Sequence, residues 1–263
     1  MVDSVITTLG AGSGIDTRRL VSDLTAATRQ PRERAIVARE AANGARIGIL
    51  AQLSSSVTTI ADSARTRLRT LADIDLPSFV EDLVGALNEL RLQINGATRS
   101  TPGVNAPLAA DNGVRTLARA VGALVGGAVA GSTLRMSDLG IATARDGTLT
   151  LDNARLAAAL AVDPVAVKTL LGVGTPVPTG LGATLQSLKF AMTGNVGVLA
   201  QSKAIYTRAS TAIVRDRERL DTDMATMTAR LTTSFVAMDR QVAVVKASQA
   251  YLTQQVAMWT VQR

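Results

Sequence analysis

Apolar residues recur every three or four positions near both ends of the chain. Towards the C-terminus they form the ladder Leu220, Met224, Met227, Leu231, Phe235, Met238, Val242, Val245, Leu252, Val256 and Trp259. Nearer the N-terminus Leu20 and Leu24 begin an apolar face, and Leu50, Leu53, Val57, Ile60, Ala64, Leu68 and Leu71 continue the pattern. A stripe with this period lies on one side of a helix and faces a partner helix. The pattern predicts that the two ends pack together or against copies of themselves.

The ladder residues are the candidate assembly interface, since this layout is typical of an assembly protein rather than an enzyme. The set is Leu20, Leu24, Leu50, Leu53, Val57, Ile60, Leu68, Leu220, Met227, Leu231, Met238, Val242, Val245, Leu252, Val256 and Trp259. An ordinary antiparallel helical hairpin within a monomer would carry the same stripes, so the periodicity alone leaves both arrangements open.

Both terminal helices are predicted to be long. The last one runs from about residue 198 for about sixty residues, or roughly 90 Å at 1.5 Å per residue. A helix of this length needs burial along its stripe to be stable. The first begins after a cap at Asp16 or Thr17, and Pro31 either starts a new helix or kinks it.

The middle of the chain carries clear capping and turn signals. A helix is predicted from Ser78 to about Asn95, where Asn-Gly resembles a C-cap. Asp111, Asp152 and Asp163 precede further helices, the last with Pro164 at the first helical position. Residues 141–143 and 148–151 are short β-prone runs on either side of an Asp-Gly turn, which predicts a hairpin.

The predicted fold is therefore mainly α, a long antiparallel coiled-coil leg plus a compact helical domain with a small β-hairpin. Residues 1–16 form a flexible N-terminal segment, and 17–71 form the N-terminal helices of the leg. Residues 78–197 form the compact domain, with the hairpin near 141–151. Residues 198–263 complete the leg.

Composition narrows the chemistry. Hydrophobic residues make up 47% of the chain but aromatic ones only 2%, which favours helices over a large β-sandwich. The chain has no Cys and no His, so disulfides, thiolate metal sites and His-based triads are excluded. No cofactor is expected.

Charge and hydropathy argue against nucleic acids and membranes as partners. The net charge is +7, but the arginines alternate with Asp and Glu and lack aromatic neighbours for base stacking. No apolar stretch reaches the length of a membrane span. The first fourteen residues carry Asp3 and no apolar core, so no signal peptide is expected.

Two patterns that resemble catalytic motifs carry no support. The glycines at 10, 12 and 14 lack the preceding strand and the Lys-Ser/Thr pair of a phosphate loop. Asp221 and Asp223 lie among arginines on a helix surface, and nothing places them in a pocket.

Four blocks, in order along the chain, resemble one known family. The first block is Leu9-Gly10-Ala11-Gly12-Ser13-Gly14-Ile15-Asp16. The second is residues 139–152, with Leu139-Gly140-Ile141-Ala142-Thr143 and Arg145-Asp146-Gly147-Thr148-Leu149, and the third runs from Asp163-Pro164-Val165 to Leu171. The fourth, near the end, joins Phe235-Val236-Ala237-Met238-Asp239 with Ser248-Gln249-Ala250-Tyr251-Leu252-Thr253-Gln254-Gln255. The chain resembles the flagellar filament-capping family, also called flagellar hook-associated protein 2. Members usually carry a large β-rich insertion before the position of Ser78, whereas Leu71 here reaches Pro77 within a few residues. The resemblance is to a minimal cap without the outer β domains to which the family's adhesive roles are attributed, which argues against adhesion and leaves open whether any adhesive role survives.

The resemblance implies a secreted structural protein at the distal tip of the flagellar filament. It implies export by the flagellar type III route without a cleaved signal peptide. The implied partners are copies of itself in a ring-like homo-oligomer, flagellin at the growing end, other hook-associated proteins and an export chaperone. The implied activity is to promote the folding and insertion of exported flagellin. The alternatives are another axial flagellar component, such as a hook–filament junction protein, and a cytoplasmic helical chaperone or adaptor.

Overall fold

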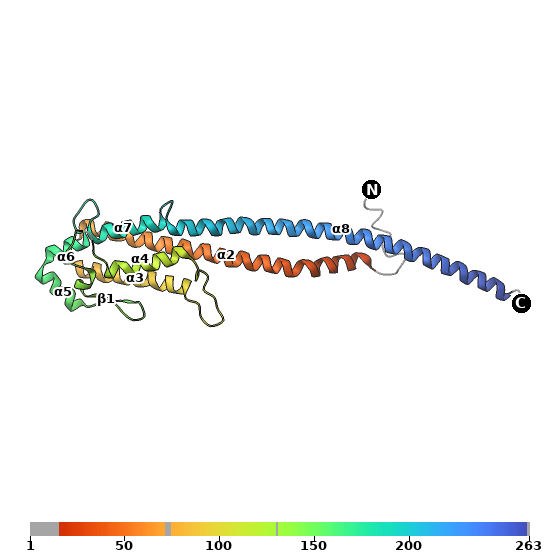
Figure 1. Cartoon of the computed structure of the whole chain (residues 1–263), viewed down its shortest axis with the longest axis horizontal. Coiled ribbons are helices and arrows are strands. Elements are labelled where there is room, and N and C mark those ends of the chain that lie inside the picture. The colour runs from red at the N-terminus through yellow and green to blue at the C-terminus, as the bar shows by residue number, and fades with distance from the viewer. Residues whose placement is uncertain (1–15, 72–74, 130, 262–263) are drawn as a thin grey trace. The chain divides into compact units, whose positions relative to one another are not determined.

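The computed structural model describes residues 16–71, 75–129 and 131–261, and the side chains up to Met258. The described chain is mainly α-helical with one two-stranded antiparallel sheet, which confirms the predicted fold class (Figure 1). The predicted flexible segment 1–16, apart from Asp16, and the glycine-rich start lie outside the described residues, as does the side chain of Trp259.

The chain divides into two compact units. The terminal unit joins the residues up to Ala41 with those from Thr211, and the central unit is Ala42–Ser210. Two long helices contribute to both units, α2 (Thr17–Thr70) and α8 (Val198–Val261). The predicted leg boundaries at 71 and 198 stay a prediction, and the structure assigns 42–70 and 198–210 to the central unit.

Pro31 lies inside α2 and does not start a new helix. A proline there removes one backbone hydrogen bond and crowds the preceding turn. Two arginines close to it in sequence offset this loss in part, because Arg29 and Arg32 both form ion pairs with carboxylates of α8.

The core of the central unit is built on the apolar stripe of α2. Leu50, Leu53, Val57 and Leu68 are almost fully buried, and they belong to one cluster with residues of α3, α4 and α7. The whole predicted ladder in this segment is therefore used inside the chain, with Ile60 and Leu71 partly buried at the edge of the cluster.

The second helix of the central unit is longer than its sequence signals indicate. It is α3, Leu76–Thr98, so it starts before Ser78 and continues past Asn95. Asn-Gly does not end it because Ala97 is buried in the core beyond that point, and Thr98 bonds back to the carbonyl of Ile94. Tertiary packing overrides the local signal here.

The predicted aspartate caps are confirmed. Asp111 caps α4 (Asn112–Gly126), Asp152 caps α5 (Asn153–Val162) and Asp163 caps α6 (Pro164–Leu171), each by accepting backbone N–H bonds of the first turn. Helix α7 (Gly180–Thr193) follows a segment rich in Pro and Gly at residues 172–179. A short 3₁₀ helix, η2 (Met136–Leu139), precedes the hairpin.

The hairpin pairs β1 (Ile141–Thr143) with β2 (Leu149–Leu151), as the Asp-Gly turn predicts. Asn88 of α3 holds it in place, because its side-chain amide donates to the carbonyl of Leu149 and accepts from the N–H of the same residue. Arg91 donates to the carbonyl of Gly147 in the turn. A two-stranded hairpin alone is marginal in water, so these bonds to α3 stabilise it.

A buried polar cluster joins α4 to α8 in the central unit. One oxygen of Asp111 accepts bonds from the N–H of Val114 and the hydroxyl of Ser202, and the other accepts from the Tyr206 hydroxyl. Burial, together with this carboxylate, raises the pKa of Tyr206. Asn43 of α2 donates to the carbonyl of Tyr206 and to the hydroxyl of Ser210. The cluster thus connects three helices through satisfied polar groups.

Replacing Asp111 with Ala should destabilise the central unit by about 2–3 kcal/mol, because one change removes a helix cap and leaves the buried hydroxyl of Ser202 and the partly buried one of Tyr206 without their acceptor. Asp163→Ala is the matched control. It removes only a cap and should lower the free energy of unfolding by about 1 kcal/mol. Urea unfolding followed by circular dichroism measures both values, and equal losses would contradict the role given to the cluster.

The ion pair between Asp62 of α2 and Lys189 of α7 makes stability depend on pH. The ammonium group lies 2.7 and 2.8 Å from the two carboxylate oxygens, and its hydrogen bonds hold the pKa of Asp62 below the ordinary value of 3.8. A depressed folded-state pKa stabilises the fold above the unfolded value and ceases to do so as the pH falls through the folded value.

The variant Lys189→Met should therefore be less stable than the wild type at pH 7, and the difference should shrink as the pH drops below about 4. Urea midpoints at pH 7, 5, 4 and 3 measure this. A difference that stays constant over this range would mean that the lysine acts through packing and not through its charge.

Candidate assembly interface

The helices of the terminal unit run antiparallel. Going along α2 from Thr25 to Glu40, its contacts on α8 move back from Thr228 to Arg217. The pairs Arg32–Asp223 and Arg39–Asp216 follow the same antiparallel order. The register is therefore set by cross-helix polar pairs over about four turns.

A small apolar seam lies between these pairs. Ile36 of α2 is buried with Ile213, Leu220 and Met224 of α8, and Met227 packs against them partly buried. Four buried residues make a small core. The pairing of the two helices therefore depends on a few side chains and on the ion pairs beside them.

The ion pairs add little stability, but they favour one register of the two helices. Arg29 contacts Asp221 at 2.7 Å and Glu33 at 3.1 Å, and the hydrogen bonds that it donates to these carboxylates, to Glu33 first, raise the pKa of the guanidinium group. The side chains in the cross-helix pairs are about one third to two thirds exposed. Exposed pairs of this kind contribute little energy singly, but their order along the helices disfavours other registers.

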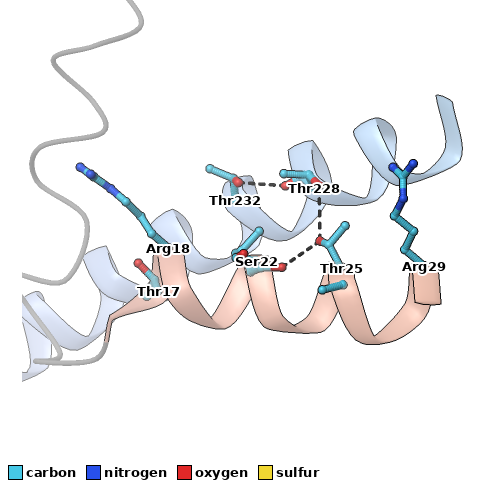
Figure 2. A pocket seen from close by; sticks show the side chains of 9 residues that line it. Thr17, Arg18, Ser22, Thr25, Arg29, Thr228 and Thr232 are labelled. Atoms are coloured by element: carbon cyan, nitrogen blue, oxygen red, sulfur yellow. Dashed lines mark hydrogen bonds between the residues drawn. The ribbon is translucent and has the colours of Figure 1, made fainter. Parts of the chain in front are cut away.

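The start of α2 borders a groove of about 500 Å³ (Figure 2). Its walls are Val21, Ala26 and hydroxyl side chains of α2, with Thr228 and Thr232 from α8. The hydroxyls of Thr25 and Thr228 lie 3.3 Å apart across it. Thr17 is buried here, and its hydroxyl has no hydrogen-bond partner among the described residues.

Beyond this groove α8 continues past the start of α2 (Figure 1). Most large apolar side chains from residue 244 to 258 are exposed there, with Val245 at 65%, Leu252 at 60% and Val256 at 60%. Val244, Tyr251 and Met258 are exposed as well. We call residues 244–258 the distal segment of α8. Its apolar ladder is left exposed by the described part of the chain.

The predicted interface residues thus fall into three groups. The buried or partly buried ones within one chain are Leu50, Leu53, Val57, Ile60, Leu68, Leu220, Met227, Leu231 and Val242. The exposed ones are Leu20, Leu24, Met238, Val245, Leu252 and Val256, and the side chain of Trp259 is not described. An intersubunit role for any of them stays a prediction.

Sequence reasoning missed several buried residues of the two long helices. Val21, Ile36 and Ile213 are buried but were not in the predicted set, and Asn43 is a buried polar residue on the same side of α2. The signal was a seven-residue spacing, since Ile36, Asn43, Leu50 and Val57 follow one another at that interval, the repeat of a helix seam. Gln249, a candidate register residue from its place in the ladder, is exposed.

The described residues offer neither a metal cluster nor a membrane span. No three acidic, His or Cys side chains among them lie close enough to hold a metal ion. None of the described helices has an apolar run long enough to cross a membrane. Asp221 and Asp223 are used as ion-pair partners of α2 arginines.

These features define a helical protein with a compact central unit and with N- and C-terminal helices that pair with each other. The family model for the C-terminus of flagellar hook-associated protein 2 matches residues 48–247, more than half of the chain. The chain belongs to the flagellar hook-associated protein 2 family.

One solved structure with a related sequence is that of the D1-D2-D3 domains of the flagellar cap protein FliD from Escherichia coli. The two chains are 27% identical, with a TM-score of 0.42, over 49% of this chain and 35% of that one. The chain therefore spans about a third of the length of that structure. No curated protein matches the chain.

Replacing Leu220 with Ala should loosen the pairing of the terminal helices by about 2 kcal/mol or more, because the seam has few residues to share the loss. Amide hydrogen exchange in residues 17–41 should then speed up by about 30-fold, while residues 76–98 should keep their wild-type rates. The control Val244→Ala removes an exposed side chain and should leave both segments unchanged. Unchanged exchange in Leu220→Ala would show that the ion pairs alone hold the helices.

Proposed function

We propose that this protein is a structural subunit of the cap at the distal tip of the bacterial flagellar filament. In this proposal it assembles into a ring-like homo-oligomer and promotes the folding and insertion of exported flagellin. The observation that carries the proposal is the distal segment of α8, an uncovered apolar ladder on a member of the hook-associated protein 2 family.

The physical argument starts from the stability of a long helix. A helix with no packed neighbour is marginal in water, and most helical stability in proteins comes from burying an apolar face. Each large apolar side chain that becomes fully covered contributes about 1.5–3 kcal/mol. The distal segment exposes several such side chains at helical spacing. Covering them on assembly would add this free energy to the stability of the oligomer.

The proposed occupant of the distal segment is a second copy of the same chain. Each copy brings an identical apolar ladder, so two or more distal segments can cover one another by the seam packing that their spacing favours. Flagellin at the growing end, other hook-associated proteins and an export chaperone are the further proposed partners. Their contacts would occur in the extracellular cap or, for the chaperone, before export through the flagellar type III route.

The proposed role requires no catalytic centre, since holding and placing subunits depends on shape and contact. The hook-associated protein 2 family is a structural one, which agrees with this role. Adhesion is not part of the proposal. The outer β domains that the resemblance links to adhesion have no room here, because only three residues separate Leu71 from Asp75.

The first test is immunogold localisation on flagella of the host. Label at the distal tip is the expected result. Label at the hook–filament boundary would instead identify a junction protein, and label confined to the cell interior would favour a helical chaperone or adaptor. A strain lacking the protein should also release unpolymerised flagellin into the medium.

The double change Leu231→Asp and Leu252→Asp should disrupt assembly, because it places two charges on the apolar ladder of α8. Sedimentation velocity should show a loss of the oligomer, and the variant should fail to restore motility. The matched control is Val162→Asp with Val165→Asp, two exposed valines of the central unit. Unchanged oligomer size and motility in the α8 variant would remove the argument from the ladder.

A further inference from the structure

Some charged side chains of α8 in the terminal unit pair with α2 and others do not. Its carboxylates at positions 216, 221 and 223 all pair with arginines of α2. Arg215, Arg219 and Arg230 are exposed and take part in no ion pair or hydrogen bond among the described residues. At 100° per residue these three lie within about 60° of one another, roughly a third of a turn from buried Leu220. We call them the arginine face.

The arginine face contains one like-charge pair at helical spacing. Arg215 and Arg219 are four residues apart, and like charges at that spacing weaken a helix. Three nearby carboxylates are engaged by α2, and the remaining one, Glu218, forms no ion pair with either arginine. A like-charge pair that a natural sequence keeps is expected where another molecule contacts it.

A complementary surface exists on α3 of the central unit. Glu81 and Glu89 are exposed and have no ion-pair partner among the described residues, and Asp82, paired with Arg67, is still 66% exposed. The one basic residue of α3, Arg91, is turned to the hairpin turn and donates to the carbonyl of Gly147. In a chain of net charge +7, this outer side of α3 is acidic. We call Glu81, Asp82 and Glu89 the acidic face.

The shape of the acidic face suits a close helix. Gly85 lies between Glu81 and Glu89, and a Cβ added to it would touch nothing within 4 Å. Glycine weakens a helix interior relative to alanine, and no contact with the described residues requires it here. Leu92 on the same side is 66% exposed. A smooth patch with an apolar side chain beside it leaves room for the long stems of arginines.

The arginine face is the longer of the two. From Arg215 to Arg230 the rise is about 22 Å, and from Glu81 to Glu89 it is about 12 Å, at 1.5 Å per residue. Both faces are carried by helices, so their charges are held on rigid supports. Charge complementarity between two such helices favours a specific partner orientation.

We propose that the arginine face of one copy docks on the acidic face of a second copy of this chain. Such a contact joins two different surfaces, so it is head-to-tail and forms a ring when the rotation closes. The inference rests on the proposed function, because it names the charged contact through which the cap oligomer would form. It is separate from the apolar distal segment, because it involves other residues and a different kind of force.

Charge reversal tests the contact. The variants are Arg215→Glu with Arg219→Glu, and Glu81→Arg with Glu89→Arg, followed by sedimentation velocity in 0.1 M NaCl. Each variant alone should associate about tenfold more weakly than the wild type or worse, because like charges then meet across the contact. A 1:1 mixture of the two variants, and a chain carrying all four changes, should regain association.

The controls separate this effect from net charge and misfolding. Arg145→Glu with Arg155→Glu changes the net charge by the same amount at exposed positions of the central unit, and it should assemble as the wild type does. Circular dichroism checks helix content. If a reversal variant fails to fold, Arg215→Gln with Arg219→Gln removes the attraction without adding repulsion and should still weaken association.

Salt provides an independent readout. The screening length falls from about 10 Å at 0.1 M to about 3 Å at 1 M, so wild-type association should weaken at high salt while that of the arginine-face variant should hardly change. If the wild type assembles and the reversal variants assemble equally well, or the mixture stays dissociated, the contact is wrong and the proposed cap role still stands. A wild type that stays monomeric at every concentration would contradict the oligomer and this contact together.

Discussion

The structure depends on covering the apolar sides of two very long helices. Helix α2 has 54 residues and α8 has 64, and neither would be stable as an isolated helix without packing along its stripe. In the central unit, helices α3, α4 and α7 bury the stripe of α2. In the terminal unit, the two helices cover each other through a seam of a few residues, and the distal segment of α8 is left uncovered.

Polar groups decide how these helices are arranged. Asn43 and Asp111 hold three helices of the central unit in one register because their side chains are satisfied only in that arrangement. Asn88 does the same for the hairpin, with both of its bonds on Leu149. In the terminal unit the arginines of α2 select the carboxylates of α8. Apolar burial supplies the stability, and these bonds select one packing among several.

The division between apolar surface buried inside the chain and surface left exposed connects the fold to the proposed cap. An assembly subunit must be stable alone and still keep surfaces for its neighbours. The central unit buries most of its apolar ladder. The terminal unit leaves the distal segment of α8 and the arginine face exposed. Family membership gives these surfaces a context in which neighbouring copies are expected. The two kinds of surface would act together, with the apolar one supplying affinity and the charged one orientation.

The sequence by itself determined the fold class, the three aspartate caps, the hairpin and the buried ladder from Leu50 to Leu68, because each depends on spacing or local backbone chemistry. It did not determine where α3 ends, since burial of Ala97 overrides the Asn-Gly signal just before it. Nor did it show that Pro31 stays within α2, or that Val21 and Ile36 are buried while Leu20 and Leu24 remain partly exposed. Periodicity determines which residues share a side of a helix, but the length of the covered part depends on where the partner helix begins. Only the tertiary structure decided that, because the register comes from pairs such as Arg39–Asp216, which are 177 residues apart in the chain.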